Sequence, residues 1–136
     1  MRKLLFIIII SLFSTAHAQK PQVIEVAFVL DLSGSTNGLL NDFRNNYYYM
    51  LNEIQAMKPK PELKIAVIVY GRPSFGKERN YVKMLSDFTQ NFDIVQYQLI
   101  QLKTSIEKGN QFVGDALQVA IRDLNWSSGD KAIKFI

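Results

Sequence analysis

The sequence contains no cysteine, and its one histidine, His17, lies close to the N-terminus. Without cysteine the chain can form no disulfide and carries no site for a lipoprotein lipid. His17 lies within an expected signal peptide, so the mature chain has no histidine either. These absences exclude Ser-His-Asp and Cys-His catalysis and zinc sites of the usual His/Cys kind. A metal site would have to be built from oxygen ligands, which favours hard cations such as Mg²⁺, Ca²⁺ or Mn²⁺.

The first eighteen residues have the pattern of a secretory signal peptide. A basic start is followed by the ten-residue apolar run from Leu4 to Phe13, and the small residues of Ala16-His17-Ala18 precede Gln19. The apolar run is too short to cross a bilayer core of about 30 Å. We therefore expect residues 1–18 to be removed on export. The bacterial periplasm, the cell envelope or the extracellular space fits this best.

Loss of the signal peptide changes the charge balance. The formal net charge of the whole sequence is +4, and removal of Arg2 and Lys3 lowers it to +2 (4 − 2). No basic run is present in residues 19–136, so nothing indicates nucleic-acid binding. The same 118 residues (136 − 18) predict a single domain.

Two β-branched apolar runs predict strands buried on both faces, and two further segments predict additional strands. The second run is followed by a loop over residues 71–80 and then by a more exposed strand, of the kind found antiparallel at a sheet edge. The four predicted strands are Val23–Leu30, Leu63–Tyr70, Tyr81–Thr89 and Lys131–Ile136.

Apolar residues at spacings of three and four predict three helices between these strands. The first contains Leu40, Phe43, Tyr47, Met50, Leu51 and Ile54, is capped by Thr36 or Asn37, and ends at the prolines of residues 58–62. The second covers Phe92–Leu102, with Val95, Leu99 and Leu102 on one face. The third covers Phe112–Leu124, with an inward face formed by Val113, Leu117, Ala120, Ile121 and Leu124.

Strands and helices that alternate in this way predict an α/β fold. We expect a three-layer, doubly wound sandwich with a central, mostly parallel sheet. The last predicted strand runs to the final residue without a turn or polar tail. Since a doubly wound domain usually has more strands, we expect the sequence to be truncated and to lack the last strands of the fold.

The segment "VAFVLDLSGSTNG" places one carboxylate and two hydroxyls directly after the first predicted strand. Asp31 supplies a full negative charge, Ser33 and Ser35 supply neutral oxygens, and Gly34 allows a tight bend. Ligands of such sheets bind beyond the carboxyl ends of the strands. Three oxygens at that edge can cover one side of a hard cation and leave its other positions to water or a ligand.

This strand, the D-x-S-x-S spacing and the helix that follows resemble the first strand and metal-ion-dependent adhesion site (MIDAS) of a von Willebrand factor type A (VWA) domain. The resemblance covers residues 23–136. It implies a doubly wound α/β fold, metal ligation by Asp31, Ser33 and Ser35, and a bound Mg²⁺ or, in its place, Mn²⁺ or Ca²⁺. It also implies binding of a protein ligand, often through a ligand carboxylate.

A second motif of that family is matched less closely. The family's glycine-rich loop, G-G-T-x-T-G-x-A-L, corresponds here to "GNQFVGDAL", so that Gln111 replaces a metal-binding threonine. The amide oxygen of Gln111 is a legitimate ligand for a hard cation, and the alternative is that it hydrogen-bonds the loop. The resemblance also places Gly34, Thr36, Asn37, Gly109 and Asn110 in the loops around the ligand. The family's later aspartate, after the fourth strand, is absent from this sequence.

Simpler structural interpretations remain open for several of these residues. Asp31 and Ser33 can form an Asx turn that caps the helix, and Asp115 suits the first turn of the third helix. Other residues have structural explanations too: a helix face with exposed rings for Tyr47-Tyr48-Tyr49, an anchor of the third helix for Trp126, and a solvated loop for Arg72, Lys77 and Arg79.

Three functions follow from the sequence. The first is an exported VWA-like domain that binds a protein or extracellular ligand through a divalent cation. The second is a metal-free scaffold for protein–protein interaction with a degenerate site. The third is a phosphatase-like hydrolase with Asp31 as nucleophile; such enzymes usually carry a second aspartate two residues later, where this chain has Ser33. We therefore do not expect an enzyme. No stable membrane span is expected after signal cleavage.

Overall fold

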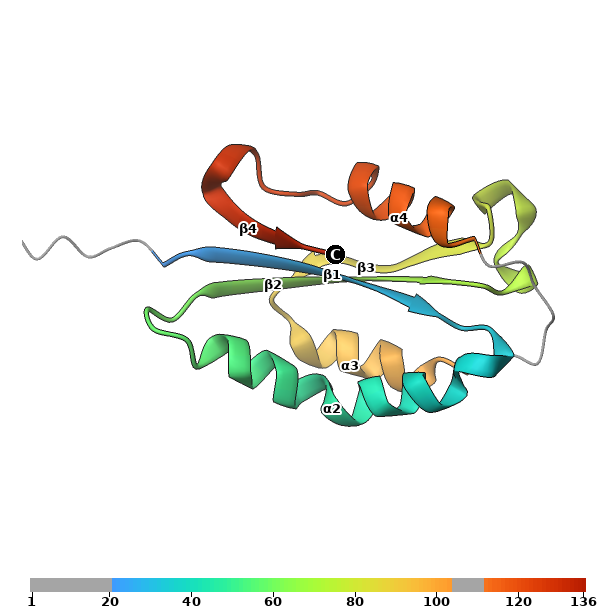
Figure 1. Cartoon of the computed structure of the whole chain (residues 1–136), viewed down its shortest axis with the longest axis horizontal. Coiled ribbons are helices and arrows are strands. Elements are labelled where there is room, and N and C mark those ends of the chain that lie inside the picture. Colours follow the sequence, from blue (N-terminus) through green and yellow to red (C-terminus); the bar gives the residue numbers. More distant parts are fainter. Residues whose placement is uncertain (1–20, 104–111) are drawn as a thin grey trace, which may run out of the picture.

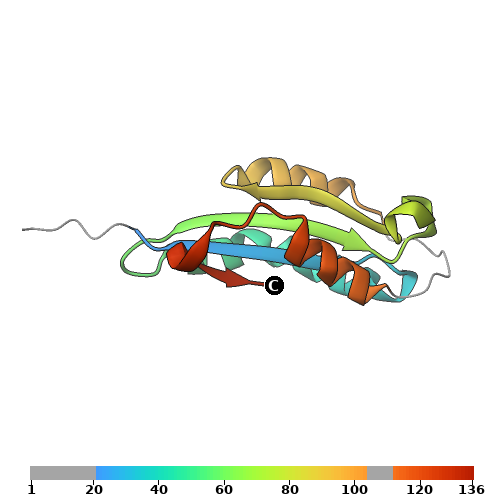
Figure 2. The ribbon, with the colours of Figure 1, turned by 90° about the horizontal axis from the view of Figure 1, so that it is seen from above.

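The computed structural model describes residues 21–103 and 112–136. A four-stranded sheet lies at its centre in the order β3-β2-β1-β4, which Figure 2 shows from above. The strands are β1 (Val23–Asp31), β2 (Glu62–Tyr70), β3 (Val82–Thr89) and β4 (Ala132–Phe135). All four predicted strands are thus present, with bounds that differ from the predicted ones by one residue or none at each end.

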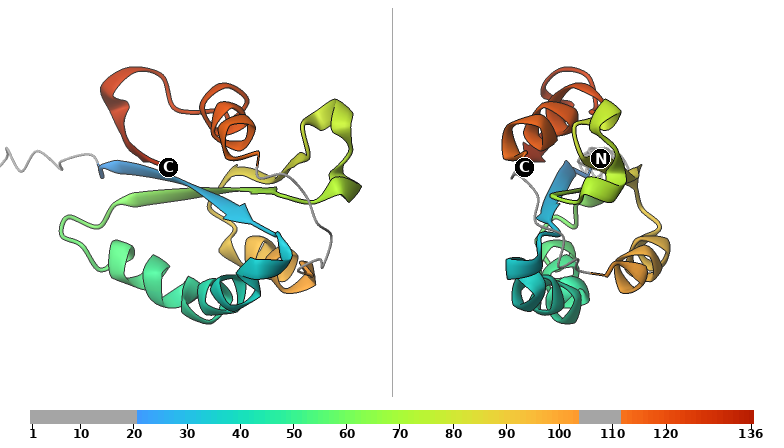
Figure 3. Two further views of the ribbon diagram at one scale, coloured as in Figure 1. Left: turned by 45° about the vertical axis from the view of Figure 1, so that its right-hand side comes forward. Right: turned by 90° about the vertical axis from the view of Figure 1, so that its right-hand side faces the viewer.

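Among the described residues, three α-helices cover the two faces of the sheet. They are α2 (Asn37–Gln55), α3 (Phe92–Gln101) and α4 (Val113–Arg122). Helices α2 and α3 lie on one face and α4 lies on the other, as seen along the sheet in Figure 1 and end-on in Figure 3. This is the predicted three-layer α/β sandwich.

The strand pairings are parallel except at one edge. Strand β1 pairs in parallel with β2 along its whole length, from Val23 opposite Glu62 to Asp31 opposite Tyr70. Strand β4 is also parallel to β1 but pairs only with residues 23–26. Strand β3 is antiparallel to β2, as predicted for an edge. Because β1 and β2 end together, Asp31 and Tyr70 lie at the same edge of the sheet.

Alternate residues of the central strands fill two apolar cores. The core under α2 and α3 contains Leu40, Tyr47 and Leu51 of α2 and Val95 and Leu99 of α3, all 3% exposed or less. These are among the residues that the sequence periodicity placed inward. Tyr48 and Tyr49 are 41% and 64% exposed, so the tyrosine run is a helix face with two exposed rings.

The inward face of α4 differs from the predicted one. Its buried residues are Ala116 and Ala120, and Leu124, just beyond the helix, is also buried. By contrast Val113, Leu117 and Ile121 are 41%, 39% and 63% exposed. The prediction was right for Ala120 and Leu124 and wrong for these three, because it assigned the large side chains to the core, whereas α4 lies so close to the sheet that alanines form the contact. Trp126 does anchor this helix, since its Nε1 donates to the Ala120 carbonyl at 2.8 Å.

A buried carboxylate positions the chain that leads into β4. Glu25 is 1% exposed and accepts hydrogen bonds from the backbone nitrogen of Ser127, at 3.0 Å, and from its hydroxyl, at 2.5 Å. The Lys64 ammonium lies 3.9 Å from Glu25 Oε1. A buried charge needs such partners, so these contacts fix the segment before β4 against β1. In residues 21–103 and 112–136, no helix has the length and apolar character needed to cross a membrane.

Candidate metal centre

Asp31 is the last residue of β1, and the chain beyond it turns while still held by the sheet. The Leu32 nitrogen donates to the Tyr70 carbonyl at 2.9 Å, and the Leu32 side chain is fully buried. The Ser33 nitrogen then donates to Asp31 Oδ1 at 2.8 Å. This is the Asx turn considered above, and it orients the carboxylate through one of its two oxygens.

The structure brings the two serine hydroxyls together beside that turn. Ser33 Oγ and Ser35 Oγ are 3.4 Å apart, and residues 34–36 form a short 3₁₀ turn that includes Gly34. The single hydroxyl proton of Thr36 is shared between the carbonyls of Asp31, at 2.8 Å, and Ser33, at 2.7 Å. Of the two residues predicted to cap the following helix, Thr36 or Asn37, it is Thr36 that occupies the N-cap position of α2, but its side chain makes no capping hydrogen bond. Its hydroxyl instead tightens the loop.

Gly71, from the neighbouring strand end, allows close approach to the carboxylate. Its φ is +87°, and a Cβ at this position would lie 2.7 Å from Asp31 Oδ1 and 3.4 Å from the Ser33 nitrogen. Both the backbone angle and the contact therefore require glycine. Gly71 was not among the predicted site residues, although a glycine directly after a buried strand was a usable signal.

The negative charge of Asp31 affects the pKa of Tyr70, the residue opposite it in the sheet. The pKa of the Tyr70 phenol is raised, first by burial and second by the negative charge of Asp31. Both effects disfavour the phenolate. Tyr70 therefore contributes a neutral hydroxyl and an apolar ring to this edge at neutral pH. Together with Asp31, Thr36, Leu39 and neighbouring residues, it lines a hollow of about 240 Å³.

The donor set of this loop fits a small hard cation. Adjacent ligands of an octahedral ion at about 2.1 Å lie roughly 3 Å apart, and the wider shell of Ca²⁺ places them somewhat further apart. The 3.4 Å between the two serine hydroxyls is close to that spacing. The Asx turn engages Oδ1, so Oδ2 is the carboxylate oxygen available for coordination. Within the described ranges, no group of three or more His, Cys, Asp or Glu side chains could hold a metal ion, so such a site would rest mainly on neutral oxygens.

The second predicted half of the site, Gly109, Asn110 and Gln111, lies outside the described residues. The helix that follows it is described, and Asp115 lies in its first turn as expected. Asp115 also has a partner that the sequence did not reveal: its Oδ1 accepts a hydrogen bond from Asn80 Nδ2 at 2.9 Å.

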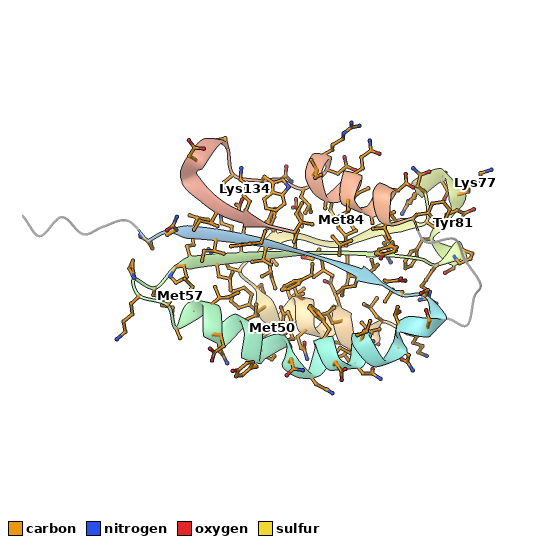
Figure 4. All side chains as sticks on the ribbon, viewed as in Figure 1. Met50, Met57, Lys77, Tyr81, Met84 and Lys134 are labelled. Atoms are coloured by element: carbon orange, nitrogen blue, oxygen red, sulfur yellow. The ribbon has the colours of Figure 1, made fainter. Side chains whose placement is uncertain are left out.

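The loop after β2 is the part of this region that sequence reasoning described least well. It contains two short 3₁₀ turns, Pro73–Phe75 and Lys77–Arg79, followed by Asn80 and Tyr81 with positive φ. The Tyr81 ring lies 4.6 Å from that of Phe112, between centroids, and Figure 4 shows Tyr81 beside the start of α4. The loop and the start of α4 therefore belong to one surface at the carboxyl edge of the sheet.

Comparison with known proteins finds similar folds at low sequence identity. The VWA domain of SpRpn10 matches with a TM-score of 0.56 and 17% identity, over 84% of this chain and 59% of that chain. The chain has the fold of a VWA domain. The pilus adhesin SpaC of Lactobacillus rhamnosus GG, in its open conformation, gives a TM-score of 0.65 and 14% identity, over 86% of this chain and 14% of that one.

A third VWA-like match is proximal thread matrix protein 1 of the mussel byssus, whose structure has a zinc-occupied MIDAS motif. It gives a TM-score of 0.57 and 15% identity, over 82% of this chain and 27% of that chain. This chain thus spans less than two thirds of the length of each of the three. No family model and no curated protein matches the sequence. The VWA-like fold assigned from the D-x-S-x-S motif is confirmed by structure, whereas the ligand assignments of Asp31, Ser33 and Ser35 stay predictions.

Proposed function

We propose that this chain is an exported, protein-binding VWA domain that holds a divalent cation, Mg²⁺ or in its place Mn²⁺ or Ca²⁺, at Asp31, Ser33 and Ser35. The observation that carries the proposal is the pair of serine hydroxyls 3.4 Å apart next to an oriented carboxylate at the carboxyl end of β1. Gln111 is a further candidate ligand. A binding role, rather than catalysis, suits a mature chain without histidine or cysteine.

The chain's own residues would define how a partner approaches. The bound cation would supply a positive charge able to accept a carboxylate oxygen of the partner. Leu39, 71% exposed, and the Tyr70 ring flank the hollow beside Asp31, so a partner side chain would meet apolar surface around a polar centre. The similarity to a pilus adhesin and the predicted signal peptide support a role at the cell surface or in the envelope.

The test is a thermal unfolding series of the mature protein with increasing Mg²⁺ or Mn²⁺. A ligand that binds the folded state raises stability by about 2.7 kcal/mol when its concentration reaches about 100 times its dissociation constant. We expect a rise in Tm that Asp31→Asn abolishes and that Asp42→Asn, an exposed carboxylate on α2, leaves intact. Equal shifts in all three proteins would refute the cation site.

The alternative is a metal-free VWA scaffold that binds a partner through its surface alone. The observation in its favour is that Asp31 lies in no cluster of three acidic, His or Cys side chains within the described residues. Partner binding that persists unchanged in EDTA and in Asp31→Asn would support this alternative.

A further inference from the structure

A second hollow, here named the Arg72 pocket, lies between α3 and β3 on the face of the sheet that α2 and α3 cover. Its volume is about 480 Å³. Its lining includes residues from three parts of the chain: Arg72 and Phe75 from the loop after β2, Lys83 and Leu85 from β3, and Tyr97 and Gln98 from α3. The pocket involves none of the predicted metal ligands.

Arg72 is partly buried and lines this pocket, whereas the sequence suggested a solvated loop. Its guanidinium carbon lies 5.6 Å from the centroid of the Phe75 ring, a cation–π distance. Its Nε is buried and finds no hydrogen-bond acceptor among the described residues. By comparison, Lys77 of the same loop points away from the molecule (Figure 4) and is exposed.

An unpaired buried N–H is costly. A small rotation of the Arg72 side chain into the pocket would let a ligand oxygen accept from this N–H and remove that cost. Gln98 also has a buried polar atom without a hydrogen-bond partner, its amide oxygen Oε1. The two ends of a glutamine amide can exchange places by rotation, so Gln98 can also present N–H groups to an acceptor. Arg72 and Gln98 thus leave hydrogen-bonding capacity unused beside the same hollow.

The charge of the pocket selects the sign of its ligand. Arg72 and Lys83 are both cationic, and no acidic residue of the described chain lines the pocket. An anionic group would therefore gain charge-assisted hydrogen bonds from the guanidinium and attraction from the exposed Lys83 ammonium. Arginine is suited to planar carboxylates because its N–H groups form a fork.

The size and the apolar lining of the pocket suit an acidic side chain better than a simple inorganic ion. A volume of about 480 Å³ lies within the range of small-molecule sites, and Phe75, Leu85 and Tyr97 provide apolar or aromatic surface. We propose that the Arg72 pocket binds an acidic side chain, glutamate or aspartate, on an exposed segment of a protein partner. Its carboxylate pairs with Arg72, and its methylene groups pack on Phe75 and Leu85.

This site is separate from the proposed cation site, although Gly71, which contacts Asp31, directly precedes Arg72. The experiment is run in EDTA so that its result does not depend on the cation. The probe is acetyl-tetraglutamate amide, titrated into ¹⁵N-labelled mature protein while the Nε–Hε signal of Arg72 is followed by NMR. Acetyl-tetraglutamine amide and inorganic phosphate are titrated in parallel.

We expect a saturable shift of the Arg72 signal with the glutamate peptide and none with the glutamine peptide. For the variants, the affinity for the glutamate peptide is measured from the shifts of the backbone amide signals of β3. It should fall roughly tenfold or more in Arg72→Gln and about threefold in Lys83→Gln. Arg79→Gln, an exposed arginine of the same loop, should bind within a factor of about two of the parent. Absence of saturation, equal binding by Arg72→Gln, or binding of phosphate but not of the peptide would overturn the proposal.

Discussion

Gly71 and Asp31 show how single residues from two strands depend on each other. Asp31 is oriented by its own loop, through the Ser33 nitrogen. The space for its carboxylate is provided by the neighbouring strand end, where Gly71 lies with a φ of +87°. The candidate site therefore requires the β1–β2 register as well as the D-x-S-x-S spacing.

The first prediction concerns Gly71→Ala. A methyl group 2.7 Å from Asp31 Oδ1, on a backbone with positive φ, must displace the carboxylate or the strand end. We expect a loss of about 1–3 kcal/mol in the free energy of unfolding, measured by urea denaturation without added cation. Gly38→Ala is the matched control, because nothing lies within 4 Å of its added Cβ and alanine favours the helix. Equal effects of the two substitutions would contradict the proposed close approach.

For single residues, the sequence predicts which side chains come together when they are close neighbours along the chain. Asp31, Ser33 and Ser35 lie within five residues, so their convergence follows from a strand end and a turn. The contacts of Gly71 and Arg72 could not be predicted in the same way, although the position of Gly71 after a strand signals a turn. Their environments are made by residues distant in sequence: Asp31 for one, and α3 and β3 for the other.

Helix α4 shows that contacts between distant parts of the chain also limit the prediction of a whole element. Its existence was predictable from apolar spacing, and so was the burial of Ala120 and Leu124. The exposure of its large side chains was not predictable, because periodicity does not reveal how closely a helix approaches a sheet. Ala116 and Ala120, both fully buried, allow α4 to contact β1, β2 and β3. The larger Val113, Leu117 and Ile121 remain on the outer side. Helices α2 and α3 were predicted correctly because their large apolar residues do face the core.

The second prediction compares two substitutions in adjacent residues of α4. Ala120→Leu adds volume where the helix lies against the sheet, so we expect a loss of about 1–3 kcal/mol in the free energy of unfolding. Ile121→Lys replaces a side chain that is 63% exposed, so we expect a change within about 0.5 kcal/mol. Denaturant unfolding of both variants checks the assignment. The reverse order of effects would show that the larger residues form the buried face after all.

For the whole molecule, the order of the elements was enough to predict the layers, since a β-α-β-β-α-α-β sequence of short connections has few arrangements. The pairing lengths were not predictable. Strand β2 is hydrogen-bonded on both sides, to β1 and β3, and its residues from Ile65 to Val69 are fully buried. Strand β4 pairs with only four residues of β1, and in the described chain its other edge is unpaired. This asymmetry across the sheet implies unequal local stability.

The third prediction is a pattern of amide hydrogen exchange across the sheet. Local opening requires less free energy where few contacts are lost, so β4 should open without the rest of the sheet. We expect the amides of Ile65–Val69 to exchange only through global unfolding. Those of Ile133 and Phe135 should exchange at a free energy lower by at least about 2 kcal/mol and nearly independent of low denaturant concentrations. If β4 instead exchanged with the same free energy and denaturant dependence as β2, the contacts of Glu25 with Ser127 would be strong enough to make the whole sheet one cooperative unit.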